Sequence, residues 1–385
     1  MKKIFVTIFV IISFIPFNSY CKETEKRLSN KAVICLQRAE KHKEQKELNK
    51  AIDMILNFKT KYPNENHHYI EYLLGTLYLD IDNLKKAHGA FEQSVKINSL
   101  FCAGWHSAGN TAYDLGLYEK AAKAFETAYS ISEKKDSKIL FASAVSYLKC
   151  NKDLKGFELL DKLLINWNKD ENHVNTFTAT GIKLNKQNHV LNVLDNLIEK
   201  NPDKKFLLKL AANTALSQNN NKTALKYLSI YSLSGETDFK TDKLTGDLAL
   251  SVNSPKRAVE FYERALKKKQ DLKIYQMIIS ALMESSDYDK ASLKAEEALK
   301  KYPDCPKLWK LNAYICYEKN DYEKSFFCAS KAMKLKANDK NLVNLFAYCA
   351  GKSGKIGDAK RLLAKADNIK SLKKDAYKIL GSFEQ

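Results

Sequence analysis

The sequence predicts an all-α protein built from tandem helical hairpins, and three observations support this. The 385 residues include only 13 Gly and 6 Pro, too few to punctuate two or three ordinary domains. Hydrophobic residues make up 45% of the chain, which is enough to bury a core along its length. A pattern of small and large apolar residues also recurs about every 34 residues, as in stacked helical repeats.

The first 21 residues have the pattern of a secretory signal peptide. Met1-Lys2-Lys3 precedes an apolar run over residues 4–17, and polar residues 18–21 follow it. The run is shorter than the roughly 20 residues that span a bilayer. We therefore expect export to a periplasm, outer envelope or extracellular space, with cleavage after Ser19 or Cys21. Residues 22–31 then form a short linker.

A second interpretation of the leader stays open, in which Cys21 is lipidated and becomes the new N-terminus. A lipid anchor of this kind would associate the protein with a membrane. Tyr20 is bulky, however, where lipoprotein signals have a small residue.

The repeat is clearest at one small residue of each predicted second helix. Successive spacings are 36, 34, 35, 34, 34, 34, 33, 34 and 34 residues. Small residues let two amphipathic helices cross closely, and stacking then buries the apolar faces that one hairpin leaves open. We expect about ten repeats over residues 32–371, and a capping helix over 372–385. The ten positions are Ala51, Ala87, Ala121, Gly156, Val190, Ala224, Ala258, Ala291, Ser325 and Ala359.

The hairpins resemble the tetratricopeptide repeat. The third unit has Trp105, the small pair Ala108-Gly109, then Ala121 and Phe125, and the same skeleton recurs in other units. The fifth and eighth units lack the small pair, and the fourth needs one extra residue. The resemblance covers nearly all of the chain after the leader and implies a right-handed α-solenoid whose first helices line a concave groove.

The resemblance also implies a non-catalytic scaffold that binds a protein or peptide in this groove. The repeats leave no room for a separate catalytic domain, so we expect neither an enzyme nor a cofactor. After Cys21, seven Cys remain without the spacing of a zinc site, so no metal is expected. These Cys are either small buried residues or, in an exported protein, partners in one or two disulfides; Cys316, Cys328 and Cys349 are expected on neighbouring helices.

The formal charge of +19, nearly all from Lys, favours anionic partners. An acidic protein segment is one such partner. The alternative is an adaptor that binds membranes or acidic glycans mainly by charge. Nucleic acid is not expected, because specific readers rely on Arg and an exported protein rarely meets it.

The resemblance places two groove positions three and six residues before the second member of each small pair. In units six to nine, six of these eight positions are Lys; in the first five units, where Ser137 and Leu140 represent the fourth, none is. We therefore hypothesise an aromatic and amide half for apolar or extended peptide, and a basic half for acidic groups. Alternatively, these Lys side chains only solvate exposed helix faces. The first half comprises Tyr69, Tyr72, His106, Asn110 and Tyr113, and the second comprises Lys209, Asn213, Lys240, Lys243, Lys273, Lys307, Lys310 and Tyr314.

Lys209 with Asn213 resembles the carboxylate clamp that some family members use for C-terminal peptides. Asp247 stands where the next Asn is needed, and Met277 where a cation is needed, so we expect no such clamp. Reversing the charge of Lys209, Lys243 and Lys310 together is expected to weaken partner capture.

Overall fold

The computed structural model describes residues 27–384 except 168, 234, 236, 338 and 367–370. The predicted signal peptide, its Cys21 and residues 22–26 of the predicted linker lie outside the described residues. None of the helices in the described part of the chain combines the length and apolar character that a bilayer crossing requires.

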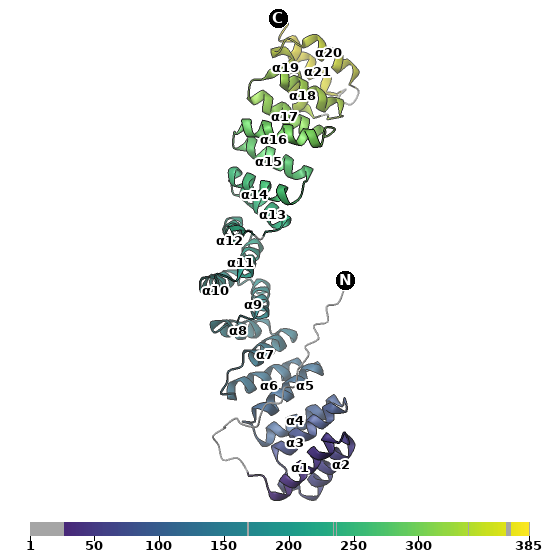
Figure 1. The fold of residues 1–385 in the computed structure, drawn as a ribbon, viewed down its shortest axis with the longest axis vertical. Coiled ribbons are helices and arrows are strands. Elements are labelled where there is room, and N and C mark those ends of the chain that lie inside the picture. The colour runs from purple at the N-terminus through teal and green to yellow at the C-terminus, as the bar shows by residue number, and fades with distance from the viewer. Residues whose placement is uncertain are drawn as a thin grey trace. The chain divides into compact units, whose positions relative to one another are not determined.

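The described residues form α helices, one short 3-10 helix and connections, with no strand among them. Twenty of the 21 α helices pair into ten consecutive hairpins, which confirms the predicted fold class (Figure 1). The first helices of the hairpins are α1 Asn30–Glu44, α3 His68–Asp80, α5 Cys102–Asp114, α7 Ser137–Lys149, α9 Glu171–Lys183, α11 Lys205–Ser217, α13 Phe239–Ser251, α15 Leu272–Glu284, α17 Pro306–Glu318 and α19 Lys340–Lys352. The second helices are α2 Leu48–Lys61, α4 Leu84–Ile97, α6 Tyr118–Ile131, α8 Asp153–Ile165, α10 Gln187–Lys200, α12 Asn221–Leu233, α14 Pro255–Lys268, α16 Tyr288–Lys301, α18 Tyr322–Lys334 and α20 Ile356–Lys365. A final helix, α21, spans Lys373–Gly381.

A residue with positive φ lies two positions after the last residue of the first helix in every hairpin. Asn, Asp and Gly adopt this left-handed conformation at the least steric cost, and they hold eight of the ten positions. The conformation turns the chain sharply enough for the second helix to pack back on the first. The ten residues are Lys46, Asp82, Gly116, Asn151, Asn185, Asn219, Asn253, Ser286, Asn320 and Gly354.

The small residues predicted at the helix crossings are all buried. In three hairpins a glycine of the first helix faces an aromatic ring of the second. A Cβ added to Gly75 would meet the ring of Phe91 at 2.6 Å, and one added to Gly109 would meet Phe125 at 2.7 Å. These positions therefore require the smallest side chain.

The fourth repeat corrects one predicted register. Its extra residue lies in the connection before α7, over residues 132–136, so the hairpin itself has the usual length. Counted from the start of α7, Ala144 therefore holds the small-pair position. Leu140, predicted to line the groove, is only 2% exposed and belongs to the core. The corresponding residues become Lys138 and Phe141, so one Lys does occur among the groove positions of the first five repeats.

The chain divides after Thr180 into two compact units. At the C-terminal end of the second unit, α21 packs against α19 and buries Ala376 and Leu380 (Figure 1). All seven Cys of the described residues are free thiols, and Cys316, Cys328 and Cys349 are buried on α17, α18 and α19.

Candidate binding surfaces

In the first unit, two of the predicted aromatic residues pack on one shared ring. Tyr69 and Tyr72 of α3 both meet Phe101 edge to face, with ring centroids 5.4 and 5.2 Å apart. Phe101 lies in the connection before α5 and was missed by the sequence analysis, although it is an apolar residue directly before a predicted helix. These rings form one aromatic cluster.

The other three predicted residues of this half have different surroundings. His106 packs against Phe125, its ring centroid 5.9 Å away, and burial lowers the pKa of His106. Tyr113 packs edge to face on Tyr118, and burial raises the pKa of Tyr113. Asn110 is half-buried. Much of the predicted aromatic surface is therefore occupied by contacts within the chain.

In the second unit, three of the predicted Lys residues already have intramolecular partners. Lys243 pairs with Asp247 at 2.7 Å, one helical turn later, and Lys310 pairs with Asp339 of the next repeat at 2.8 Å. Lys209 lies over the ring of Tyr231, 4.6 Å from its centroid. Charge reversal at Lys243 or Lys310 would set two carboxylates side by side, so these positions are poor tests of partner binding.

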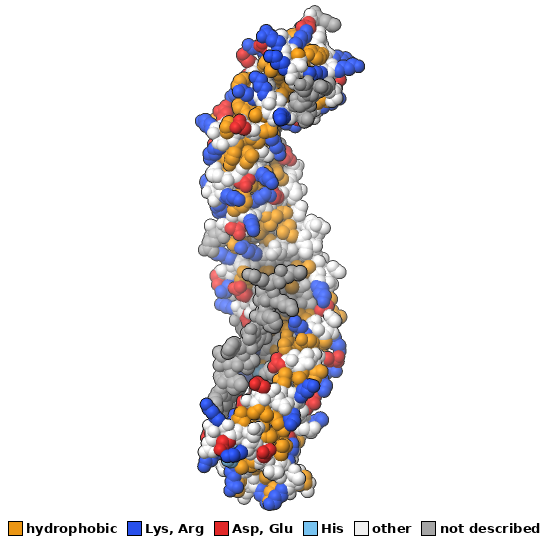
Figure 2. Space-filling view, turned by 90° about the vertical axis from the view of Figure 1, so that its right-hand side faces the viewer, with side chains coloured by type: hydrophobic (Ala, Val, Ile, Leu, Met, Phe, Trp, Pro, Cys, Tyr) orange, Lys and Arg blue, Asp and Glu red, His pale blue; other side chains and the backbone are white. Residues whose placement is uncertain are grey.

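Lys240, Lys273 and Lys307 are exposed, and no acidic oxygen among the described residues lies within 4.0 Å of their Nζ atoms. Each is the second residue of its helix, α13, α15 or α17. Asp238 and Asp271 cap two of these helices, accepting hydrogen bonds from Thr241 N and Lys273 N. Acidic groups therefore lie close to the exposed Lys residues, and Figure 2 shows the two charge types interspersed over the face that it presents.

Asn213, Asp247 and Met277 stand at the positions considered for a carboxylate clamp. Asn213 is exposed on α11, and Met277 is half-buried on α15. Asp247 accepts hydrogen bonds from Lys243 at 2.7 Å and from the Tyr262 hydroxyl at 2.8 Å. These bonds already occupy both oxygens of the Asp247 carboxylate.

A pocket of about 360 Å³ lies on the first-helix side of repeats nine and ten, where α21 forms part of its wall. Tyr314, Tyr317 and Tyr348 contribute three aromatic rings, and only Tyr314 was predicted. The sequence analysis missed Tyr348 because it stopped at the ninth repeat; it overlooked Tyr317, which lies in that repeat at the position equivalent to the predicted Tyr113. The same groove positions in repeat ten are Asn341 and Asn344, and the position after its small residue is Tyr348. The full lining is Tyr314, Tyr317, Asn341, Asn344, Leu345, Tyr348 and Ile379.

Ring contacts fix the aromatic walls of the pocket: Tyr348 meets Tyr317 edge to face at 5.8 Å and Phe383 at 5.7 Å. Asn344 Oδ1 is buried away from solvent and accepts no hydrogen bond from the described residues. Burial raises the pKa values of Tyr314 and Tyr317, so both rings stay neutral at ordinary pH.

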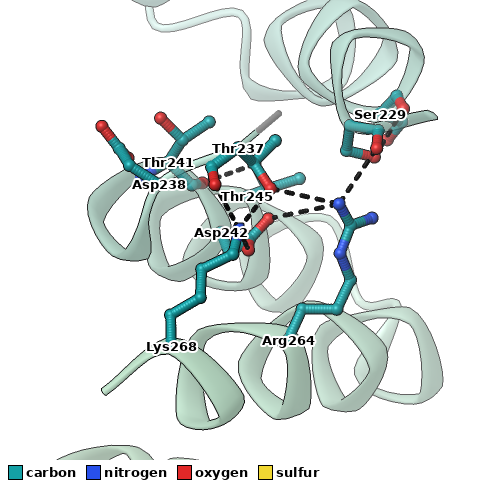
Figure 3. A network of polar contacts seen from close by, with 9 residues as sticks. Ser229, Thr237, Asp238, Thr241, Asp242, Thr245, Arg264 and Lys268 are labelled. Carbon is teal, nitrogen blue, oxygen red and sulfur yellow. Dashed lines mark hydrogen bonds and ion pairs between the residues drawn. The ribbon is translucent and has the colours of Figure 1, made fainter. Parts of the chain in front are cut away.

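A buried carboxylate elsewhere in this unit has a structural role. Asp242 of α13 is 0% exposed, and its Oδ2 lies 2.5 Å from Lys268 Nζ of α14 (Figure 3). Arg264 Nη2 lies 3.7 Å from Asp242 Oδ1 and also donates to Ser232 O and to Thr237 Oγ1. The cluster ties the connection before α13 to α14. Arg264 and Lys268 already bind groups of this chain, so the cluster is a poor candidate for a ligand site.

Among the described residues, no group of three or more His, Cys, Asp or Glu side chains is placed to hold a metal ion.

The ten stacked hairpins define a helical-repeat protein. The tetratricopeptide repeat model matches residues 277–326. This match falls inside an array of hairpins of similar length, so the chain shares the architecture of tetratricopeptide repeat proteins.

The chain is also similar to solved structures. The structure of Naa15/Naa10 bound to HypK-THB is 12% identical, with 92% of this chain and 66% of that chain covered and a TM-score of 0.50. A tetratricopeptide repeat protein from Parabacteroides merdae is 15% identical, with 66% and 100% covered and a TM-score of 0.36. YrrB, described as having an unusual peptide-binding site, is 16% identical, with 50% and 96% covered and a TM-score of 0.35. No curated protein sequence matches the chain.

Proposed function

We propose that this protein is a non-catalytic scaffold of the cell envelope or exterior that binds a segment of a partner protein along the first helices of its repeats. Tetratricopeptide repeats generally serve as protein interaction scaffolds. The observation that carries the proposal is the pocket around Tyr314 and Tyr348, where three Tyr rings, Leu345 and Ile379 form largely apolar walls beside two Asn side chains. Apolar walls with a few polar groups are typical of recognition sites. The location rests on the leader pattern of residues 1–21.

Site-specific photocrosslinking in the producing cells tests the binding function. A photoreactive residue replaces Asn341 at the pocket in the full chain, and the matched control places it at Arg361 on the second helix of the same repeat, where the side chain is 81% exposed. We expect a defined adduct from position 341 and none from 361. Absence of adducts at position 341, or equal adducts at both positions, would contradict a partner on the first-helix side.

Export has its own test. Cell fractionation should place the protein outside the cytoplasm. Sequencing of the mature N-terminus should find Tyr20 or Lys22 as the first residue. A lipid-modified Cys21 at the new N-terminus would identify the membrane-anchored form. Recovery of intact Met1 in the cytoplasmic fraction would contradict export.

A second candidate function is an adaptor for anionic surfaces, and the exposed Lys240, Lys273 and Lys307 favour it. Their replacement by Glu should abolish sedimentation with anionic phospholipid vesicles if charge drives binding. Binding by charge alone should also disappear between low and moderate salt, because screening shortens the reach of exposed charges to about 8 Å at physiological ionic strength. Sedimentation unaffected by salt and by the triple substitution would exclude this candidate.

A further inference from the structure

We propose that Cys316 and Cys328 form a disulfide that joins the two helices of the ninth hairpin when the chain folds in contact with a disulfide oxidant. Cys316 lies near the end of α17, and Cys328 lies in the middle of α18, twelve residues later in the chain. A disulfide here is a modification site that does not depend on the proposed binding function.

Both thiols meet at one buried side chain. Asn312 of α17 is 2% exposed, and its Nδ2 donates a hydrogen bond to Cys328 Sγ at 3.5 Å. The Cys316 thiol donates to Asn312 Oδ1 at 3.9 Å and also hydrogen-bonds with the Cys328 thiol. The packing of α17 on α18 therefore brings the two sulfurs together, as a disulfide between facing helices requires.

The third buried thiol of this region has a different partner. Cys349 of α19 donates a hydrogen bond to Ser325 Oγ at 3.2 Å. Ser325 in turn donates to the backbone oxygen of Ala313 at 2.8 Å. The sequence placed all three Cys on neighbouring helices without a choice of pairing. The contacts in the core select Cys316 with Cys328.

The contact between the two thiols also decides which of them reacts first. The hydrogen bond with Cys328 lowers the pKa of the Cys316 thiol, with Lys324 of α18 acting in the same direction. The same hydrogen bond and burial raise the pKa of the Cys328 thiol. Because the thiolate is the nucleophile in disulfide exchange, Cys316 is the attacking residue.

Glutathione disulfide is an oxidant of the required class. The Cys316 thiolate attacks one of its sulfurs, a mixed disulfide forms, and one glutathione thiolate leaves. Cys328 then loses its proton and attacks the sulfur of Cys316, which releases the second glutathione thiolate. Two thiols of the chain are oxidised, and one glutathione disulfide is reduced to two glutathione molecules that take up the two protons.

The burial of both residues sets the time at which the bond forms. Cys316 is 3% exposed and Cys328 is 1% exposed, so the finished stack covers both thiols. The hairpin needs only local contacts to form, whereas α19 has to pack on α18 to complete the cover. We therefore expect oxidation during folding. The leader pattern of residues 1–21 predicts export, and exported proteins fold where such oxidants are present.

Oxidative refolding of the full chain tests the proposal. The reduced, unfolded protein is refolded with glutathione and glutathione disulfide, free thiols are alkylated in denaturant, and the product is digested with trypsin. We expect a linked pair of peptides, residues 311–319 and 325–331, that dithiothreitol separates. Hydrogen exchange of α17 and α18 should be about 100-fold slower in the oxidised protein than in the reduced protein, because the bond restricts the unfolded chain.

Three variants identify the pair. Cys316→Ala and Cys328→Ala should each abolish the linked peptides, and the matched control Cys349→Ala should retain them. Comparing oxidised with reduced wild-type protein needs no substitution, so that result is independent of the stability of any variant.

Two results would overturn the proposal. One is wild-type protein in which every thiol is alkylated after refolding, and the other is a main crosslink that contains residues 341–352, the peptide of Cys349. Equal hydrogen exchange in the oxidised and reduced proteins would show that the bond does not hold α17 to α18. Photocrosslinking at position 341 tests the scaffold function separately, so either can fail alone.

Discussion

Gly246 on α13 lies directly against the ring of Tyr262 on α14, so that a Cβ added to Gly246 would come within 2.4 Å of Tyr262 Cε1. The ring has no room to withdraw, because Tyr262 is fully buried and its hydroxyl donates a 2.8 Å hydrogen bond to Asp247. Burial and this carboxylate together raise the pKa of Tyr262 well above its usual range. Close helix crossing in this repeat therefore depends on glycine.

Gly246→Ala should lower the free energy of unfolding by about 1–3 kcal/mol, the usual cost of overpacking a core. Urea unfolding followed by circular dichroism measures it. Gly89→Ala on α4 is the matched control, because a Cβ there meets nothing within 4 Å and alanine is the better helix former. Similar unfolding midpoints for the two variants would contradict the proposed steric role.

Lys268→Met should destabilise the protein by about 3–5 kcal/mol, because it leaves Asp242 buried without its closest cation. The double variant Asp242→Leu/Lys268→Met should recover a large part of the loss, since no unpaired charge remains. Thermal unfolding of the single and double variants completes the cycle. Lys319→Met is the control: it breaks an exposed pair with Asp289 and should cost less than about 1 kcal/mol. Equal losses in both single variants would rule out a special role for burial.

Unfolding of the first unit should become easier as pH falls from about 6.5 to 4. Burial, with the neighbouring His67, lowers the pKa of His68 to about 4, while an unfolded histidine titrates near 6.5. Between these values the unfolded chain binds a proton that the native chain does not, so stability is lost on acidification.

His68→Phe should flatten this pH dependence by about one proton, because it retains the ring contact with Phe101 and removes the titrating group. Urea midpoints measured at pH 4.5, 5.5 and 7.5 give the proton uptake. Burial also lowers the pKa of His173, so a smaller slope should remain. An unchanged slope in the variant would show that His68 is not one of the sources.

Leu380→Asp should detach α21 and cost more than about 3 kcal/mol, because Leu380 is 0% exposed against α19. It should also abolish the adduct from a photoreactive residue at position 341, since Ile379 of α21 lines the same pocket. Hydrogen exchange of α19 and α21 measures the detachment. Ser382→Asp, at an exposed position two residues later, should change neither property. Protection of α21 that survives in Leu380→Asp would contradict this role.

The sequence by itself determined the repeat and its phase. The ten small residues, from Ala51 to Ala359, could be recognised without coordinates because each hairpin needs a small side chain at the same crossing point. The left-handed turn residues recur with the same spacings as these small residues. Both requirements act within about 20 residues of chain, so the sequence pattern carries them completely.

Only the tertiary structure decided which side chains remain available for binding. Lys310 is neutralised by Asp339 of the next repeat, and the pocket is completed by Ile379 from the final helix, contacts that no single hairpin contains. Leu140 shows the same limit, because one residue added before α7 rotates each predicted position by about 100° around the helix and turned an expected groove residue into a core residue. Helix pattern is local, whereas charge pairing and pocket shape depend on side chains that meet only after the repeats stack.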